Sequence, residues 1–449
     1  MENSPAMQWP LLISSKRLGL ERYHDPRSHT RSDFQRDFDR MIFSSPFRRL
    51  QNKTQVFPLP GSIFVHNRLT HSLEVSSVGR SMANVVADGL RVKYASRSWV
   101  GILQHLGDIV ATACLCHDLG NPPFGHSGEK AIGTFFSEQR GRDMRGDLTE
   151  EQWADIINFE GNANSLRVLV HQFAGRRPGG FAMTYSALAS IVKYPYASIH
   201  AGAKGKFGFF SAELSIYRKI AAELGIPALD EGQTIFMRHP LVYIVEAADD
   251  ICYQIMDIED AHKLKILPHD HTVELLMAYV PEERKNHTWE TLGRVSDPNE
   301  KVAYLRSTAI GVLTEQCAAA FLDHEDDILS GRLKGSLIDN MRSMQAREAY
   351  ASCSHTAFDK IYSATEVVDI ELAGHRIITY LLGRLLEAVL HPEEYASRLL
   401  LHKIPEQYET DAPDRYGRIL SVLDHVSAMT DVYALDLFRK LNGHSLPAV

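Results

Sequence analysis

Apolar side chains recur along most of the chain at the spacing of an amphipathic helix. They fall three and four positions apart through 72–90, and residues 109–116 are almost all apolar, which predicts a buried helix. A longer helical pattern follows Pro240 and runs through 241–266. No stretch of useful length alternates between apolar and polar residues, as a half-buried strand would. The pattern therefore predicts an all-α protein, with later helices at 304–322, 336–349, 366–390 and 416–441.

The same pattern divides the chain into three expected regions. An N-terminal segment with an arginine-rich helix covers 1–60, a helical body covers 61–270, and a C-terminal helical region packed on that body covers 271–449. Residues 21–50 are polar, which favours a segment that is solvated or that contacts another subunit. Its arginines are Arg22, Arg27, Arg31, Arg36, Arg40, Arg48 and Arg49.

Composition and charge are those of a soluble globular protein. Apolar residues make up 44% of the 449 residues, charged residues make up 23%, and the net charge of −8 gives no global basic signature for nucleic acid. The five cysteines are scattered and form no zinc-ribbon pattern, so a reduced, cytoplasmic location is expected. No apolar run reaches the roughly 18 residues of a membrane span, and the N-terminus does not resemble a signal peptide, so no membrane partner is expected.

The densest group of chemically active side chains lies at 116–129. His117 and Asp118 follow the apolar run directly, so both begin inside the protein. A buried charged pair is costly unless it is paired or bound to a ligand. Two prolines stiffen the turn that follows, and Ser127 is the expected N-cap of a new helix with Glu129 in its first turn.

Four side chains are candidate metal ligands: His71, His117, Asp118 and Asp249. Each lies in or beside a helix with an apolar face, so each is expected to point inward. Two histidines and two carboxylates suit a divalent ion such as Mn²⁺, Fe²⁺, Ni²⁺ or Zn²⁺, with positions open for water and a phosphate oxygen. The plainer alternative is a histidine that is simply satisfied within the core.

With these residues in order, the chain resembles the HD-domain phosphohydrolases, and within them the deoxyguanosinetriphosphate triphosphohydrolase (dGTPase) family. The four candidate ligands match the H…HD…D signature, and six flanking phrases occur in the family's order from about residue 20 to 441. The resemblance implies an all-α fold, with an HD-domain helical core and an additional C-terminal helical region. The matching phrases are 47–57, 67–72, 117–126, 159–163, 246–253 and 429–435.

The resemblance implies a metal-dependent reaction in which a dNTP, dGTP among them, is hydrolysed to the deoxynucleoside and inorganic triphosphate. The bond cut joins the α-phosphorus to the 5′ oxygen. One divalent ion, which could be Mn, Ni, Fe, Zn or Mg, would polarise an α-phosphate oxygen. His126 would move a proton at the reacting oxygens, and Glu129 would orient its ring.

The substrate-binding residues are also carried over from the resemblance. Arg68, Lys193 and Lys206 match positions that bind the triphosphate. Tyr253 and Asp257 match the sugar pocket, where the ring disfavours a 2′-hydroxyl and the carboxylate accepts from the 3′-hydroxyl. The remaining matches are Gln55 and Val56 on the base side, with Asn121, Asn162 and Tyr194.

Several of these residues also have plainer roles. Arg68 could pair with Glu74 on its own helix, and Lys193 and Lys206 could be solvated surface lysines. Tyr253 could simply pack in the core, and Asp257 could solvate the face of its helix.

The expected partners are the dNTP substrate and further copies of the chain, in an even-numbered homo-oligomer such as a hexamer. The sequence leaves open whether a dNTP or single-stranded DNA acts as an effector. It also leaves open other functions on the same fold: a nucleotide phosphomonoesterase, a phosphodiesterase, or a nucleotide or single-stranded DNA sensor without turnover.

The chain departs from the family pattern in two places. Val432 stands where the family's C-terminal phrase usually has arginine, and 141–158 is shorter than in some relatives.

Overall fold

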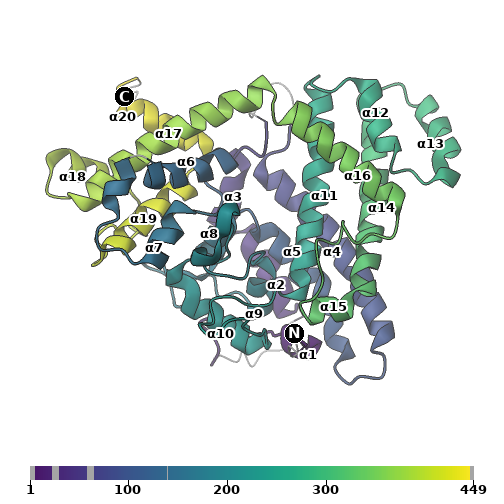
Figure 1. Cartoon of the computed structure of the whole chain (residues 1–449), viewed down its shortest axis with the longest axis horizontal. Helices are drawn as coiled ribbons and strands as arrows, with labels where there is room; N and C mark the ends of the chain where they lie inside the picture. The colour runs from purple at the N-terminus through teal and green to yellow at the C-terminus, as the bar shows by residue number, and fades with distance from the viewer. Residues whose placement is uncertain (1–5, 23–29, 58–64, 139, 445–449) are drawn as a thin grey trace.

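The computed structural model describes residues 6–22, 30–57, 65–138 and 140–444, and this part of the chain is built from helices (Figure 1). It contains twenty α-helices, while its β-pairing is confined to five isolated bridges. The all-α prediction is therefore confirmed. No described helix combines the length and the apolar character needed to cross a membrane.

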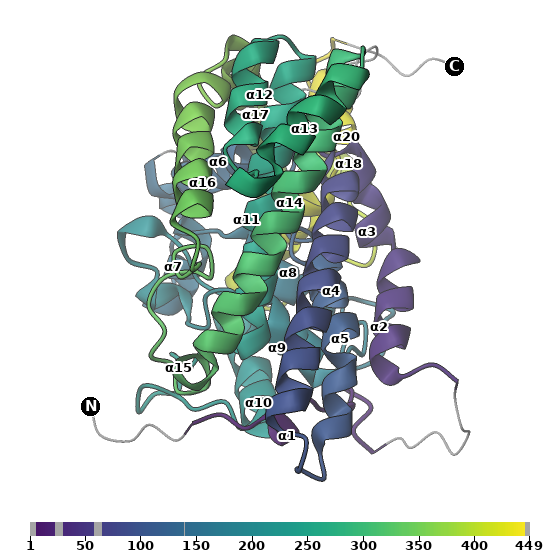
Figure 2. The same ribbon diagram turned by 90° about the vertical axis from the view of Figure 1, so that its right-hand side faces the viewer.

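Four helices that pack against one another form the centre of the molecule (Figures 1 and 2). They are α4 (Arg68–Lys93), α5 (Leu106–Cys116), α11 (Pro240–Lys263) and α14 (Pro298–Asp323). Gly79 of α4 allows the closest approach, because a Cβ there would lie 2.7 Å from Cys114 Sγ of α5 and 3.4 Å from Ala248 Cβ of α11. The close packing brings polar residues from three separate helices within reach of one another.

Helix α5 is apolar on almost every side because other helices surround it. It packs against α4 and α11 and also against α2 (Asp33–Ile42) and α9 (Tyr185–Ile191). Every residue of α5 except Asp108 is buried. His117 and Asp118 follow the last turn of this buried helix, so their side chains enter the protein at its centre.

The N-terminal segment packs on this central group through α1 (Trp9–Leu12), α2 and α3 (Ser45–Arg49). Several of its arginines bond within the chain: Arg31 pairs with Asp39, and Arg40 donates to the carbonyl oxygens of Phe181 and Ala182 at 2.7 and 2.6 Å. Arg27 lies outside the described residues. A role for this segment in subunit contacts stays a prediction.

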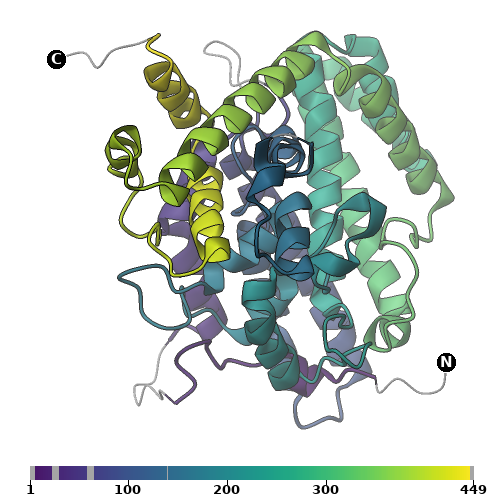
Figure 3. The same ribbon diagram turned by 60° about the vertical axis from the view of Figure 1, so that its left-hand side comes forward.

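A second cluster of buried apolar residues forms where distant parts of the chain meet (Figure 3). Here α6 (Gly125–Glu138) packs along α17 (Thr365–Leu390), and α17 also packs on α19 (Arg415–Ala428) and α20 (Asp431–Leu441). The C-terminal helices therefore cover the helix that begins just after His117 and Asp118.

Shorter helices complete the described chain and include a peripheral hairpin formed by α12 and α13 (Figure 1). They are α7 (Glu150–Ile157), α8 (Gly161–Val170), α10 (Leu214–Leu224), α12 (His269–Met277), α13 (Glu282–Arg294), α15 (Glu325–Leu329), α16 (Met344–Thr356) and α18 (Tyr395–Leu401).

Three local predictions were wrong. The helix expected at 336–349 begins only at Met344, with Ser343 as its N-cap, because 336–340 forms a turn in which Asp339 accepts from the Ser336 amide at 2.8 Å. The helix expected at 416–441 breaks after Ala428, and Thr430 N-caps the next helix. Ser127 is not an N-cap; it lies inside α6 and donates to the carbonyl oxygen of Glu371 at 2.7 Å.

Candidate functional site

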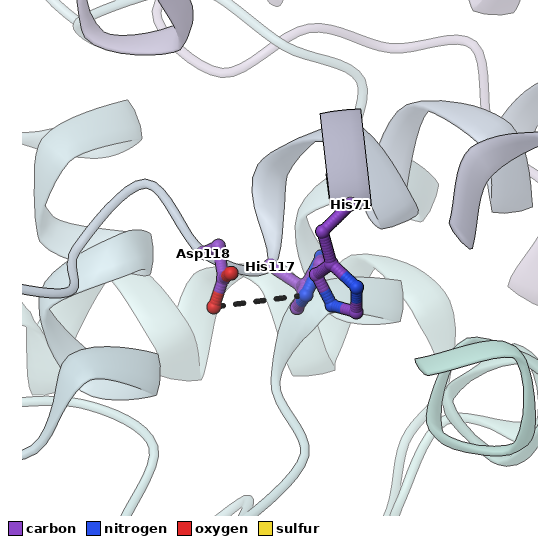
Figure 4. A group of neighbouring side chains, drawn as sticks. All are labelled: His71, His117 and Asp118. Atoms are coloured by element: carbon purple, nitrogen blue, oxygen red, sulfur yellow. Dashed lines mark ion pairs between the residues drawn. The ribbon is translucent and has the colours of Figure 1, made fainter. Parts of the chain in front are cut away.

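Three central helices place the candidate metal ligands. His71 lies in the first turn of α4, which Asn67 caps by accepting from the Thr70 amide. His117 and Asp118 follow the end of α5, and Asp249 lies in the middle of α11. Figure 4 shows the rings of His71 and His117 side by side, with the carboxylate of Asp118 turned toward His117.

Ligand atoms of His71, His117 and Asp118 lie within 4.8 Å of one another, a separation that one metal ion could bridge. Asp249 Oδ1 lies 3.0 Å from His71 Nε2 and 3.4 Å from His117 Nε2, while Asp118 Oδ1 is 3.6 Å from the same His117 nitrogen. All four predicted ligands are thus brought together. Donors of these types suit a divalent transition metal.

The imidazole of His117 is oriented as a metal ligand would be. Its Nδ1 lies 2.6 Å from the carbonyl oxygen of Cys114, which fixes the proton on Nδ1 and leaves the lone pair on Nε2. That Nε2 is buried and makes no hydrogen bond to the described residues. A buried, unsatisfied nitrogen that faces two carboxylates fits a site for a cation.

The charges around this cluster favour a positive charge at its centre. Burial by itself would lower the pKa of His117, yet Asp118 and Asp249 raise it to about 9. Burial would raise the pKa of Asp249, but His117 and His71 hold it well below 3.8. Two ionised carboxylates therefore demand a cation, which a proton on His117 or a metal ion can supply.

Arg68 binds the outer oxygen of the Asp118 carboxylate. Its Nη1 lies 2.8 Å from Asp118 Oδ2, both side chains are buried, and Asn121 donates to the other oxygen. The alternative pairing of Arg68 with Glu74 is wrong, since Glu74 instead lies 3.1 Å from the ring of His66. Arg68 therefore serves the cluster of candidate ligands rather than the surface of its own helix.

His126 and Glu129 form a pair one helical turn apart at the start of α6. His126 Nδ1 lies 2.9 Å from Glu129 Oε2, and the other oxygen of Glu129 accepts from the Gly161 amide at 2.8 Å. Glu129 is buried, whereas 64% of the His126 side chain is exposed. A buried carboxylate thus holds one ring nitrogen and leaves Nε2 free to meet a ligand.

A cavity of about 600 Å³ lies beside this pair and contains several of the predicted residues. Of the residues named from the sequence, it is lined by Gln55, Val56, His126, Glu129, Lys206 and Tyr253. The other predicted substrate-binding residues and the four candidate metal ligands are outside its described lining; these substrate-binding residues are Arg68, Asn121, Asn162, Lys193, Tyr194 and Asp257. The volume is large enough for a nucleotide-sized ligand.

Lys206 reaches the cavity from a loop and contacts two carboxylates. Its Nζ lies 2.7 Å from Glu160 and 3.8 Å from Glu129. Glu160 also caps α8 by accepting from the Asn162 and Ala163 amides, and it accepts from the Asn162 side chain at 2.8 Å. Lys206 and Asn162 are therefore held by one buried acid, which contradicts a solvated surface role for Lys206.

The side chain of Lys193 is also largely buried. Its Nζ lies 3.3 Å from Glu246, which Arg238 contacts as well at 2.7 Å. Burial would lower the pKa of Lys193, but Asp250, Glu246 and Asp249 together raise it. Its Nζ is 5.9 Å from the ring centre of Tyr194, and only 22% of its side chain is exposed, so Lys193 is not a solvated surface lysine.

Tyr253 and Asp257 lie one turn apart on α11. The Tyr253 ring meets His71 edge-on at 6.4 Å and lies 6.0 Å from the ring of Tyr362. Asp257 is buried, which raises its pKa, and it accepts from the Tyr362 hydroxyl at 2.9 Å. The alternative of a solvated Asp257 is therefore wrong.

The C-terminal wall of the cavity consists of residues that the sequence did not predict as part of the site. Tyr362, Val367, Ile370 and Glu371 line it from the start of α17, more than one hundred residues beyond Tyr253. No local pattern marks them, because an aromatic residue before a helix and a glutamate in its second turn are ordinary sequence features. Only the packing of α17 across α6 brings them to the cavity.

The chain is similar to known proteins along most of its length. A model of the HD domain matches residues 68–159, and a model of the phosphohydrolase-associated domain matches residues 342–440. The chain is 37% identical over 455 residues to a deoxyguanosinetriphosphate triphosphohydrolase-like protein of Pseudomonas aeruginosa (strain LESB58), covering 98% of this chain and all of the relative.

Two further relatives extend this similarity. A deoxyguanosinetriphosphate triphosphohydrolase-like protein of Synechocystis sp. is 36% identical over the same shares of the two chains. The deoxyguanosinetriphosphate triphosphohydrolase of Yersinia pseudotuberculosis is 31% identical over 91% of this chain and 93% of its own.

Proposed function

Since the chain belongs to the deoxyguanosinetriphosphate triphosphohydrolase family of HD-domain phosphohydrolases, we propose that it hydrolyses deoxynucleoside triphosphates, dGTP among them. The products would be the deoxynucleoside and inorganic triphosphate, and the reaction would depend on one divalent metal ion. The observation that carries the proposal is the placement of His71, His117, Asp118 and Asp249 beside a cavity with its own histidine–glutamate pair.

His71, His117, Asp118 and Asp249 would hold the metal, which would supply a Lewis acid for an α-phosphate oxygen. Hydrogen bonds prepare the residues for this task, since Cys114 orients His117 while Arg68 and Asn121 hold the two oxygens of Asp118. Such outer partners fix the orientation of the ligands and tune their basicity.

Arg68, Lys193 and Lys206 would bind the negative charge of the triphosphate. Arg68 keeps its other terminal nitrogen near Gly125, where an added Cβ would lie only 2.6 Å from Nη2. Lys206 contacts Glu160 and Glu129 at the cavity, so a polyphosphate would compete with these acids for its ammonium group. Cations at these positions neutralise charge on the substrate and in the transition state.

His126 would move the proton at the reacting oxygens. Glu129 accepts from Nδ1, which leaves Nε2 as the nitrogen that faces a substrate, and the buried carboxylate stabilises the ring when it is positively charged. Departure of the 5′ oxygen requires a proton, and activation of water requires a base; a histidine within reach of the phosphate can serve either step.

The sugar and base would occupy the end of the cavity formed by Tyr253, Tyr362 and the start of α17. Asp257 would accept from the 3′-hydroxyl, and the ring of Tyr253 would leave no room for a 2′-hydroxyl. Gln55, Val56 and Glu371 line the rest of this end. The carboxylate of Glu371 suits a base edge that carries hydrogen-bond donors, as guanine does.

The proposal is tested by product analysis. Metal-loaded protein is incubated with each dNTP and each rNTP, singly and mixed, and the products are separated by ion-exchange chromatography. We expect deoxynucleoside and triphosphate from dNTPs and little turnover of rNTPs. Release of orthophosphate or pyrophosphate would instead indicate a phosphomonoesterase or a different phosphohydrolase, and binding without turnover would indicate a sensor.

We also propose an even-numbered assembly, such as a hexamer, located in the cytoplasm. All five cysteines are unpaired and buried, which is compatible with a reducing compartment. Large apolar side chains stay exposed, including Phe43 beside the arginine-rich helix α2 and Leu372 on α17. Light scattering at working concentration tests the assembly, and a monomer would contradict it.

A further inference from the structure

Three distant segments of the chain meet beside the candidate active site. One is 53–54, which precedes α4; the second is the turn 121–124 between Asp118 and α6; the third is 427–431, where α19 gives way to α20. The first two segments lead directly into residues that line the cavity, whereas the third belongs to the C-terminal helices. We name their meeting point the three-segment junction.

Asp431 binds both cavity segments through their backbones. Its carboxylate is buried and accepts from the Thr54 amide at 2.8 Å through one oxygen and from the Phe124 amide at 3.0 Å through the other. Thr430 caps α20, so the carboxylate of Asp431 is not needed for that end of its own helix. Each oxygen therefore fixes one of the two segments.

Lys53 makes a second connection among the same segments. Its side chain is buried, and its Nζ donates to the Asn121 carbonyl at 2.5 Å and to the Ser427 carbonyl at 2.6 Å. The Lys53 carbonyl in turn accepts from the Arg68 amide at 3.2 Å at the start of α4. The junction is thus linked by hydrogen bonds to the start of α4, which carries His71, and to the turn that leads into α6, which carries His126 and Glu129.

The turn at the junction has an unusual backbone. Phe124 has φ of +63° and Gly125 has φ of +59°, and the left-handed conformation is uncommon for a bulky residue such as phenylalanine. Such a conformation persists when its surroundings hold it, and here the Phe124 amide is bound by Asp431. His126 follows two residues later, so the position of its ring depends on this turn.

We propose that Asp431 is a positioning residue, which fixes the segment that leads into Gln55 and the turn that leads into His126 in one geometry. The C-terminal helices thereby form part of the framework of the active site, although their side chains at the junction lie outside the described lining of the cavity. The inference rests on the proposed function, because it assigns Asp431 a task in that same reaction.

The first test compares two substitutions on one helix. Asp431→Asn keeps the size of the side chain but replaces one acceptor oxygen by a donor, so one of the two amides loses its partner. The matched control is Asp436→Asn, at a half-exposed residue of α20 whose carboxylate pairs with Lys440 at 2.6 Å. Asp431→Asn should lower kcat by about 10- to 100-fold while metal content is kept, because a misplaced catalytic group costs that much. The control should keep wild-type kcat, and an unchanged kcat in Asp431→Asn would overturn the proposal.

A double-substitution cycle separates positioning from a general structural effect. If Asp431 acts through His126, Asp431→Asn should lower the rate by less than about 3-fold once His126 is already alanine, because coupled residues are not additive. A full additional loss in the His126→Ala background would show that Asp431 acts by another route and would overturn the assignment.

Hydrogen exchange tests the junction without any turnover. The amides of Thr54 and Phe124 should exchange faster in Asp431→Asn than in wild type or in Asp436→Asn, and unchanged protection would overturn the geometry. Asp431→Glu retains the carboxylate, so the two amides should be better protected in it than in Asp431→Asn. Weaker protection in Asp431→Glu would contradict the proposal. This variant also serves as the test if Asp431→Asn does not fold. If the variants differ in exchange as expected but wild-type protein does not hydrolyse dNTPs, the proposed function fails while the junction stands.

Discussion

Two clusters of buried charges in the described structure differ in how their charges are satisfied. In one, Arg167 of α8 donates to both oxygens of Asp424 at 2.8 Å and to Glu213 at 2.5 Å. All three side chains are buried, and they join α8 to α19 and to the short turn before α10. The guanidinium group directs its bonds to partners already present in the chain.

The candidate metal cluster is arranged differently. His117 Nε2 is buried without a hydrogen bond to the described residues, and two carboxylates face it. The cluster also lies near a cavity, whereas the Arg167 network lies beside a hollow of only about 190 Å³.

The difference separates a structural role from a functional one. Buried charges that pair with one another hold elements together, and removal of one partner leaves the other uncompensated. Carboxylates and histidines that converge on one another without full pairing suit a bound cation, and perturbed titratable groups beside a cavity are typical of functional sites. Substitutions in the first cluster should therefore affect stability, and substitutions in the second should affect activity.

The largest expected effect is that of Asp118→Ala. Loss of this carboxylate should abolish metal retention and turnover, while the helical circular dichroism spectrum persists because the packed helices are unchanged. Added Mn²⁺ should raise the melting temperature of wild type but not of the variant, since only a binding-competent native state gains stability from a ligand. The matched control is Asp108→Ala, at the other end of α5, where the carboxylate pairs with Arg80. Full metal occupancy in Asp118→Ala would contradict the assignment.

His126→Ala and Glu129→Ala should keep metal and substrate binding but lose turnover. A positioned acid or base contributes about two to four orders of magnitude in rate, so kcat should fall by about 10²- to 10⁴-fold with little change in dNTP affinity. Single-turnover rates paired with equilibrium dNTP binding on metal-loaded variants measure both quantities. Near-normal turnover in His126→Ala would remove that residue from the mechanism.

Arg167→Ala should show the opposite behaviour. Two buried carboxylates lose their partner, which should lower the free energy of unfolding by about 3–5 kcal/mol. Activity per folded molecule and metal content should stay near wild type, because the network lies apart from the cavity. Denaturant unfolding combined with active-site titration checks this. If Arg167→Ala were as stable as wild type but had lost turnover, the Arg167 network would have a functional role rather than a structural one.

The smallest expected effect concerns pH. Burial raises the pKa of Glu213 to about 7 despite Arg167, from 4.5 in an unfolded chain. The folded state therefore binds more protons than the unfolded state between these values, so this group's contribution to stability falls as pH rises from about 4.5 to 7. The groups that face Glu213 are Arg167, His171, Asp424 and Asp155.

Glu213→Gln should flatten this part of the stability–pH curve, measured by denaturant unfolding between pH 4.5 and 8. A curve identical to that of wild type would show that Glu213 does not titrate in this range.

Much of the fold and site follows from local sequence. The apolar run before His117 predicts a buried helix, and the spacing of Asp249, Tyr253 and Asp257 places them on one face of a helix. These features depend on neighbours within one or two turns, so periodicity reveals them.

Local periodicity does not predict contacts between distant segments of the chain. Glu371 reaches the cavity only because α17 crosses α6, and Asp431 binds backbone amides that carry no side-chain signature in the sequence. The late start of α16 likewise depends on a local competitor, because the Asp339 carboxylate holds 336–340 in a turn that competes with the helix.

The most direct test of the central claim is hydrolysis of dGTP in H₂¹⁸O by metal-loaded protein, with the products identified by mass spectrometry. If the α-phosphorus is attacked beside the His71, His117, Asp118 and Asp249 cluster, one ¹⁸O should appear in the triphosphate, and deoxyguanosine should be unlabelled. Asp118→Ala should give neither product. Labelled orthophosphate with dGDP, or label in the deoxyguanosine, would contradict the account.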